Sequence, residues 1–297
     1  MPLREVKRLI VTADDFGLSL PINEAVEKAH RHGVLSAASL MVGAPAAEDA
    51  VSRARSLRSL GGGLHLTLLE GRPVLPPAKV PGLVEPDGRF SSDPFRFGVA
   101  LFLSPDLRRQ ANAEIGAQFE RFRETGLAMD HVNGHRHFHL HPVVTQAIAR
   151  LAPRFGSPPV RVPLEPFGPS FRASRDRLVG RLACWLFYLG QTRRLRRGLA
   201  AAGVDSNDHV FGLYDSGAMT EDRLLRLIDH LPSGVSEVYC HPATGYWKGP
   251  DNLPSCYRAD EELRALLSPA LRIKIEASGL RPLSYRAALD WAQRSPA

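Results

Sequence analysis

The amino-acid sequence predicts an α/β fold, a distorted (β/α) barrel whose functional site lies at the C-terminal ends of the strands. Strand patterns alternate with helical patterns along the chain, which favours parallel strand–helix–strand units. Asp and His residues directly follow several strand patterns, and in a barrel such residues meet at one face. The 297 residues, 44% of them hydrophobic, can bury a full core, and we expect a single domain over residues 1–297.

The individual elements follow from short apolar or alternating runs and from longer runs of helical period. Strands are expected at residues 7–12, 36–42, 63–68, 129–133, 159–162, 209–211, 237–240 and 271–275. Helices are clearest at residues 21–32, 44–59, 106–125, 142–151 and 220–230. Residues 72–92 are rich in Pro and Gly and predict a long loop beside the site.

Two adjacent carboxylates, Asp14 and Asp15, end the first strand pattern. Neighbours in a strand face different directions, so one can ligate a cation while the other moves protons. The structural alternative is an Asx turn or a helix N-cap, for which a single Asp is sufficient. The pair therefore favours chemistry at this strand end.

Alternate histidines occupy the segment 135–141. In an extended strand all four imidazoles would lie on one face, where burial without partners would cost several kcal/mol in total. A solvated His-rich edge is the alternative, but the nearby pair of carboxylates favours a metal site or proton transfer. The four residues are His135, His137, His139 and His141.

Two further strand patterns deliver a histidine. His65 lies among apolar neighbours, where a lone histidine is more often a hydrogen-bonded core residue than a ligand. His241 directly follows the strand pattern that ends at residue 240. Because four strand ends each carry Asp or His, one shared site is favoured.

Four blocks of this sequence resemble the signature blocks of the YdjC-like carbohydrate deacetylases, which include chitooligosaccharide deacetylase. They are residues 12–17, 63–66, 131–142 and 240–243. The resemblance spans most of the chain and implies a distorted barrel and a metal-dependent N-deacetylase. Residues 35–42 and 70–76 most resemble the hopanoid-biosynthesis branch, which implies an N-acetylglucosaminyl hopanoid, such as N-acetylglucosaminyl bacteriohopanetetrol, as substrate.

Carried over residue by residue, the resemblance assigns roles to five side chains. It implies that Asp15, His65 and His135 are metal ligands. It also implies that Asp14 is the general base and that His241 is the general acid.

The sequence departs from the family pattern at Arg136. Chitooligosaccharide deacetylase has three consecutive histidines where this chain has His135, Arg136 and His137, so the role of Arg136 stays open. Arg161 weakly resembles an Arg-x-Pro block that positions the base in more distant polysaccharide deacetylases, and a plain salt bridge is the alternative. We expect the other three histidines of the block to surround the ligands or line the substrate groove.

The donor set suits one divalent ion. Mg(II) and Zn(II) are the foremost candidates, and Mn(II) or Co(II) also fit. Such an ion lowers the pKa of a bound water and polarises the acetyl carbonyl, while Asp14 accepts the proton. A histidine such as His241 can protonate the departing amine. Neither a nucleophile elbow nor a Cys-centred dyad is visible, so no covalent intermediate is expected.

Two other function classes stay open. Another barrel metalloenzyme, such as a sugar isomerase or phosphoesterase, would fit the ligands but would release no acetate. A basic module that binds lipid or nucleic acid without catalysis would leave Asp14, Asp15 and the histidine block unexplained. No recognisable nucleic-acid motif is present, so we expect no nucleic-acid partner.

The net charge of +7 is concentrated in one segment. Eight arginines with Asp176 as the one acidic residue flank the uncharged, aromatic-rich stretch 182–189. A basic amphipathic helical insertion over residues 172–202 would suit peripheral contact with a membrane. The alternative is a barrel helix whose apolar stripe faces the core. The arginines are Arg172, Arg175, Arg177, Arg181, Arg193, Arg194, Arg196 and Arg197.

Cysteine usage and the first residues suggest the compartment. Cys184, Cys240 and Cys256 have no paired metal spacing and form no even set, which indicates a reducing environment. Charges near the N-terminus and a short apolar run fit neither a signal peptide nor a spanning helix. We expect a soluble cytoplasmic protein that could lie at the inner membrane surface.

Overall fold

A single parallel sheet forms the core of the computed structural model, which describes residues 6–247 and 252–294. Within these residues the sheet has six strands in the order β4-β3-β2-β1-β6-β5. The strands are β1 (Lys7–Phe16), β2 (Ala37–Leu40), β3 (Gly61–Leu66), β4 (Val132–Gly134), β5 (His209–Phe211) and β6 (Gly234–Cys240). Strand β1 is buried along its whole length after Lys7. Its continuous apolar run is typical of a strand covered on both faces.

The sheet curls into a half-barrel, and an irregular segment, residues 159–164, connects its two edge strands. On the β4 side the backbone N–H of Val132 donates to the carbonyl of Pro159 at 2.8 Å. On the β5 side the N–H of Val210 donates to the carbonyl of Leu164 at 3.0 Å. The predicted distorted barrel is confirmed, although the expected strand at 159–162 is reduced to a bridge with Val132.

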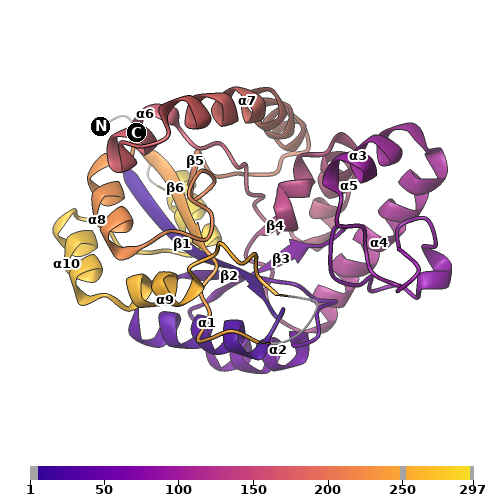
Figure 1. The fold of residues 1–297 in the computed structure, drawn as a ribbon, viewed down its shortest axis with the longest axis horizontal. Helices are drawn as coiled ribbons and strands as arrows, with labels where there is room; N and C mark the ends of the chain where they lie inside the picture. The colour runs from indigo at the N-terminus through magenta and orange to yellow at the C-terminus, as the bar shows by residue number, and fades with distance from the viewer. Residues whose placement is uncertain (1–5, 248–251, 295–297) are drawn as a thin grey trace.

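Helices surround the sheet (Figure 1). In this view α1 and α2 lie below the strands, α8 to α10 at the left, α3 to α5 at the right and α7 across the top. The helices are α1 (Leu20–His32), α2 (Ala47–Ser56), α3 (Pro94–Leu103), α4 (Pro105–Glu124), α5 (Pro142–Leu151), α6 (Phe167–Ser174), α7 (Leu178–Ala201), α8 (Glu221–His230), α9 (Ala259–Leu267), α10 (Pro269–Ala277) and α11 (Tyr285–Arg294), with short 3-10 helices η2 (Pro77–Lys79), η3 (His135–Leu140) and η4 (Ala152–Phe155).

The strand expected at residues 271–275 is wrong, because these residues lie within α10. Ser268 caps the helix by accepting a hydrogen bond from the N–H of Leu271 at 3.2 Å, and a proline at the first position favours helix. Leu271 and Ile275, four residues apart, are buried, whereas Ile273 is 64% exposed. The alternation in the sequence therefore imitates a strand, but its outer members form one helix face.

The basic segment forms the end of α6 and helix α7. Four residues of α7 are buried: Arg181, Thr192, Leu195 and Leu199. Val179, Leu186 and Phe187 of its first half are exposed, whereas Tyr188 packs on the core. The expected apolar stripe that faces the core therefore accounts for only part of this half of the helix.

No helix of the described residues carries an apolar stretch long enough to cross a membrane. Cys184, Cys240 and Cys256 are free thiols, of which Cys240 is buried and Cys256 exposed.

Candidate metal and catalytic site

A bulge at the C-terminal end of β1 presents Asp14 and Asp15. The strand pairs with β2 through Ala13 and again through Phe16, and its register shifts between these two residues. Asp15 has a φ of 61°, in the left-handed region that non-glycine residues seldom adopt. An extra residue in one strand re-aims its side chains. Both carboxylates consequently line the same cavity although they are neighbours in sequence.

Asp15 meets His65 from β3 and His135, which directly follows β4. One ligand atom from each of the three residues lies within 4.8 Å of the others. Asp15 Oδ1 is 2.9 Å from His135 Nδ1 and 3.3 Å from His65 Nε2. The structure thus brings together the three predicted ligands in a group that could hold one divalent ion.

The outer nitrogens of both histidines are fixed by oxygen acceptors. His65 Nδ1 lies 2.6 Å from Asn133 Oδ1, and His135 Nε2 lies 3.0 Å from Glu70 Oε2. Because these oxygens accept, we assign the ring protons to the two outer nitrogens. With an ion bound between them, His65 Nε2 and His135 Nδ1 would each offer a lone pair to it. This arrangement of acceptor, histidine and open nitrogen is typical of protein metal sites, so the residues fit a metal ion.

Two carboxylates, those of Asp15 and Glu70, lie beside His135. Burial would lower its pKa, but the carboxylates of Asp15 and Glu70 raise the pKa of His135 to about 10. Burial would raise the pKa of Asp15, yet His135 and His65 hold this pKa well below its usual value. Carboxylates that draw positive charge so strongly onto one histidine also suit a cation.

Asp14 forms a buried ion pair with Arg161. Arg161 Nη1 donates to Asp14 Oδ2 at 2.5 Å, and Nη2 donates to Oδ1 at 3.0 Å. On its other edge Arg161 donates from Nε to Glu237 Oε2 at 2.8 Å, and Tyr285 donates its hydroxyl to Glu237. Burial would raise the pKa of Asp14, but Arg161, with His65 nearby, keeps this pKa far below its usual value. Asp14 is therefore ionised.

His241 enters the cavity from the end of β6. Its backbone N–H donates to Glu262 Oε2 at 2.5 Å, which anchors the turn after the strand. The rings of Tyr239 and Tyr257 lie 5.6 and 4.8 Å from the imidazole, measured between centroids. Nδ1 of His241 is buried and has no hydrogen-bond partner among the described residues. This nitrogen is thus free for a proton or a ligand.

The segment after β4 is not an extended strand. It forms η3, in which Arg136 and His137 have φ angles of 55° and 54°. Two successive left-handed residues break the two-residue period, so the four alternate imidazoles do not share a face. This differs from the arrangement considered for an extended strand.

The other three histidines of the block accordingly have separate surroundings. His137 lines the cavity, and its Nε2 lies 3.1 Å from the hydroxyl of Tyr239. His139 Nε2 lies 3.0 Å from the carbonyl of Arg161. His141 caps α5 and is directed to the carbonyl of Gly98, at 3.1 Å. His137 and His139 thus surround the site, whereas His141 joins α5 to α3.

Five of the predicted site residues line one cavity of about 670 Å³, whereas Arg161 is fully buried beside Asp14; the five are Asp14, Asp15, His65, His135 and His241. The size of the cavity is typical of pockets for small ligands. The long loop 72–92 contributes Glu85, Asp87 and Arg89 to the lining, so the prediction of a loop beside the site is confirmed. Arg136 also lines the cavity, and its guanidinium lies 3.6 Å from Glu70.

Several supporting side chains were not predicted. Two of them could have been found from the sequence. Asn133 precedes His135 by two residues in the same block, and Glu237 is a charged residue within a strand pattern. Nothing in the sequence marks Glu70 or Glu262 as part of the site, because their hydrogen-bond partners are distant in the chain. Glu262 also accepts from the N–H of Met219 at 2.8 Å.

Comparisons with known proteins place the chain in one family. The family model described as YdjC-like protein matches residues 8–277. A carbohydrate deacetylase of Geobacillus stearothermophilus is 32% identical over 278 residues, which cover 93% of this chain and 96% of the relative. A human carbohydrate deacetylase is 32% identical over 92% of this chain and 88% of its own. The chitooligosaccharide deacetylase of Salmonella paratyphi B is 28% identical over 93% and 97%, respectively.

The fold also occurs among solved structures. A protein of Enterococcus faecalis V583 described as a cellobiose-phosphate cleavage protein matches with a TM-score of 0.72. The match covers 95% of this chain and 98% of the other at 24% identity. At this level of identity the likeness shows the shared fold.

Proposed function

The chain belongs to the YdjC-like family, and from this membership we propose that it is a carbohydrate deacetylase, a hydrolase of an amide C–N bond, that acts on an N-acetylglucosamine unit. The observation that carries the proposal is the convergence of Asp15, His65 and His135 beside Asp14 and His241 in one cavity. Products are acetate and a free amine.

We assign complementary proton transfers to Asp14 and His241. Asp14 is ionised and accepts the proton of the attacking water as the new C–O bond forms. His241 donates a proton to the sugar nitrogen as the C–N bond breaks. Asp15, His65 and His135 would hold a divalent ion, Mg(II) or Zn(II) foremost, which would polarise the acetyl carbonyl and acidify the water. Arg161 fixes the carboxylate of Asp14 through two hydrogen bonds.

For the substrate we propose an N-acetylglucosaminyl hopanoid, such as N-acetylglucosaminyl bacteriohopanetetrol. The support is the resemblance of residues 35–42 and 70–76 to the hopanoid-biosynthesis branch. The relatives above carry the names carbohydrate and chitooligosaccharide deacetylase, so short chitooligosaccharides are the competing substrate. A lipid-linked sugar would place the enzyme at the cytoplasmic face of a membrane.

A panel of substrates, each assayed for released acetate, tests both the deacetylase activity and the choice of substrate. The purified protein with each divalent metal is incubated with N-acetylglucosaminyl bacteriohopanetetrol and with chitooligosaccharides. Acetate from either supports the deacetylase, and faster release from the lipid supports the hopanoid proposal. Acetate from neither, together with isomerised sugar or released phosphate from matched substrates, would indicate another barrel metalloenzyme. The Asp14→Asn variant serves as the blank.

A further inference from the structure

The first half of α7 has its charged residue inside and five large apolar residues outside. Arg181 is 2% exposed, whereas Val179, Leu186 and Phe187 are 79%, 58% and 66% exposed. Leu178 and Leu182, on the same side of the helix, are 50% and 41% exposed. An ordinary surface helix shows the opposite arrangement.

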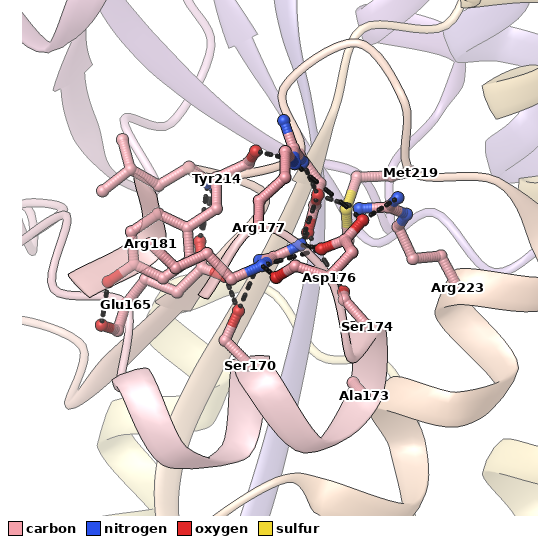
Figure 2. A network of polar contacts seen from close by, with 12 residues as sticks. Glu165, Ser170, Ala173, Ser174, Asp176, Arg177, Arg181, Tyr214, Met219 and Arg223 are labelled. Carbon is pink, nitrogen blue, oxygen red and sulfur yellow. Dashed lines mark hydrogen bonds and ion pairs between the residues drawn. The ribbon is translucent and has the colours of Figure 1, made fainter. Parts of the chain in front are cut away.

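A polar network fixes this rotation of the helix (Figure 2). Arg181 donates to Asp215 at 2.8 Å and to Asp176 at 2.6 Å, and its Nη1 donates to Ser170 at 3.1 Å. Arg223 binds the same two carboxylates. Turning Arg181 outward would leave the buried carboxylate of Asp215 and the partly exposed one of Asp176 with fewer partners, which is costly for the buried group. The outward apolar side is therefore set by the fold.

The same side of α7 becomes basic further along. Residues 193 and 197 follow Leu186 by two and three helical turns, so Arg193 and Arg197 share its side, and Arg194 follows Phe187 in the same way. All three arginines are exposed, and within the described part of the chain none is ion-paired. Helix α7 contains no acidic residue.

Helix α3 adds a second apolar side. Phe95 is 80% exposed, and Val99, Phe102 and Leu103 are 44%, 57% and 69% exposed. Helices α3 and α7 both pack on α5 and lie along the upper edge in Figure 1. Phe90 and Ser92, just before α3, line the catalytic cavity, as does Tyr188 of α7. Both helices therefore adjoin the cavity.

We propose that this apolar–arginine face binds the surface of an anionic lipid bilayer. The face consists of the exposed residues of α3 and α7: Phe95, Val99, Phe102, Leu103, Leu178, Val179, Leu182, Leu186, Phe187, Arg193, Arg194 and Arg197. Large exposed apolar patches mark interaction surfaces, and a helix with both aliphatic and basic residues suits a membrane interface. Arginines held near anionic headgroups add electrostatic attraction.

The basic end of the face favours this occupant over a second copy of the chain. In a symmetric dimer across α7, the arginines would meet either one another or the exposed leucines of the partner. The first arrangement brings like charges together, and the second buries unpaired charge. A bilayer can bind the basic and the apolar part of the face at the same time, because its headgroups are charged and its acyl region is apolar.

Vesicle sedimentation without substrate tests the proposal, so the outcome does not depend on which sugar is deacetylated. We expect the protein to bind phosphatidylcholine vesicles containing phosphatidylglycerol, and to bind less as salt rises from low to high ionic strength. Val179→Gln with Leu186→Gln, and Arg193→Gln with Arg194→Gln and Arg197→Gln, should each lower binding at least tenfold. Far-UV circular dichroism and thermal unfolding serve as the check that these variants are folded.

Matched controls remove similar groups elsewhere. Ile273→Gln, on α10, removes an equally exposed apolar side chain. Lys28→Gln with Arg58→Gln and Arg264→Gln removes three exposed positive charges on other elements. Both controls should bind vesicles as the parent protein does. Absence of vesicle binding by the parent protein, or equal loss in variants and controls, would overturn the proposal. Self-association that requires Leu186, seen by analytical ultracentrifugation without vesicle binding, would assign the face to a second copy instead.

Discussion

Arg161 donates two hydrogen bonds to the carboxylate of Asp14, at 2.5 and 3.0 Å, and the two residues are 0% and 2% exposed, respectively. The guanidinium is shared with Glu237, so two carboxylates balance one positive charge. We expect this ion pair also to position Asp14, because the bonds that pair the charge of Arg161 would hold the carboxylate in its orientation.

Replacing Asp14 by Asn should remove the proton acceptor while preserving the shape of the side chain. We expect kcat to fall on the order of a hundredfold or more, as for a missing general base, while bound metal is retained. Steady-state kinetics and metal analysis of the purified variant measure both. A rise in KM with unchanged kcat would show instead that Asp14 binds substrate.

Replacing Glu237 by Gln should destabilise the fold, because Arg161 is fully buried and would keep a single counter-charge. A buried pair that loses one partner costs about 3 kcal/mol. Tyr285→Phe removes only the hydroxyl that donates to the buried carboxylate of Glu237 and should cost about 2 kcal/mol, as for a hydrogen bond to a charged group. Urea unfolding of both variants gives the comparison. Equal free energies of unfolding would mean that Glu237 does not balance Arg161.

Replacing His241 by Ala should slow the step in which the amine departs. The loss in kcat should be on the order of a hundredfold, and it should grow as the leaving amine becomes less able to leave without a proton. A series of acetamides with amines of graded basicity measures this dependence. A uniform loss across the series would assign His241 to substrate binding or to packing against Tyr257.

Replacing Glu70 by Ala should weaken metal binding, because Glu70 accepts the outer proton of His135. Loss of such an oriented acceptor lowers metal affinity by about 10- to 100-fold. Isothermal titration with Zn(II) or Mg(II) measures the Kd. Glu85→Ala, in the same cavity lining, is the matched control and should leave the Kd unchanged. Equal Kd values for the two variants would exclude this role for Glu70.

Residues at strand ends were predictable, whereas the surroundings of each residue were not. Asp14, His65 and His241 each end or follow an apolar run, and parallel strands bring such positions together. The alternation of apolar residues around Ile273 wrongly predicted a strand. Over only five residues, the two-residue period of a strand and the four-residue spacing of a helix face place apolar residues at the same outer positions, Leu271 and Ile275. The rotation of α7 also could not be predicted, since it depends on carboxylates contributed by other segments.

The most direct test of the account is a metal titration of the chelator-treated protein in which bound ion and acetate release are measured together. We predict that acetate release returns in proportion to the bound divalent ion and saturates at one ion per chain. We also predict that the His65→Ala, His135→Ala double variant recovers neither the ion nor the activity. Full acetate release with no ion bound, or undiminished metal content in the double variant, would contradict the account.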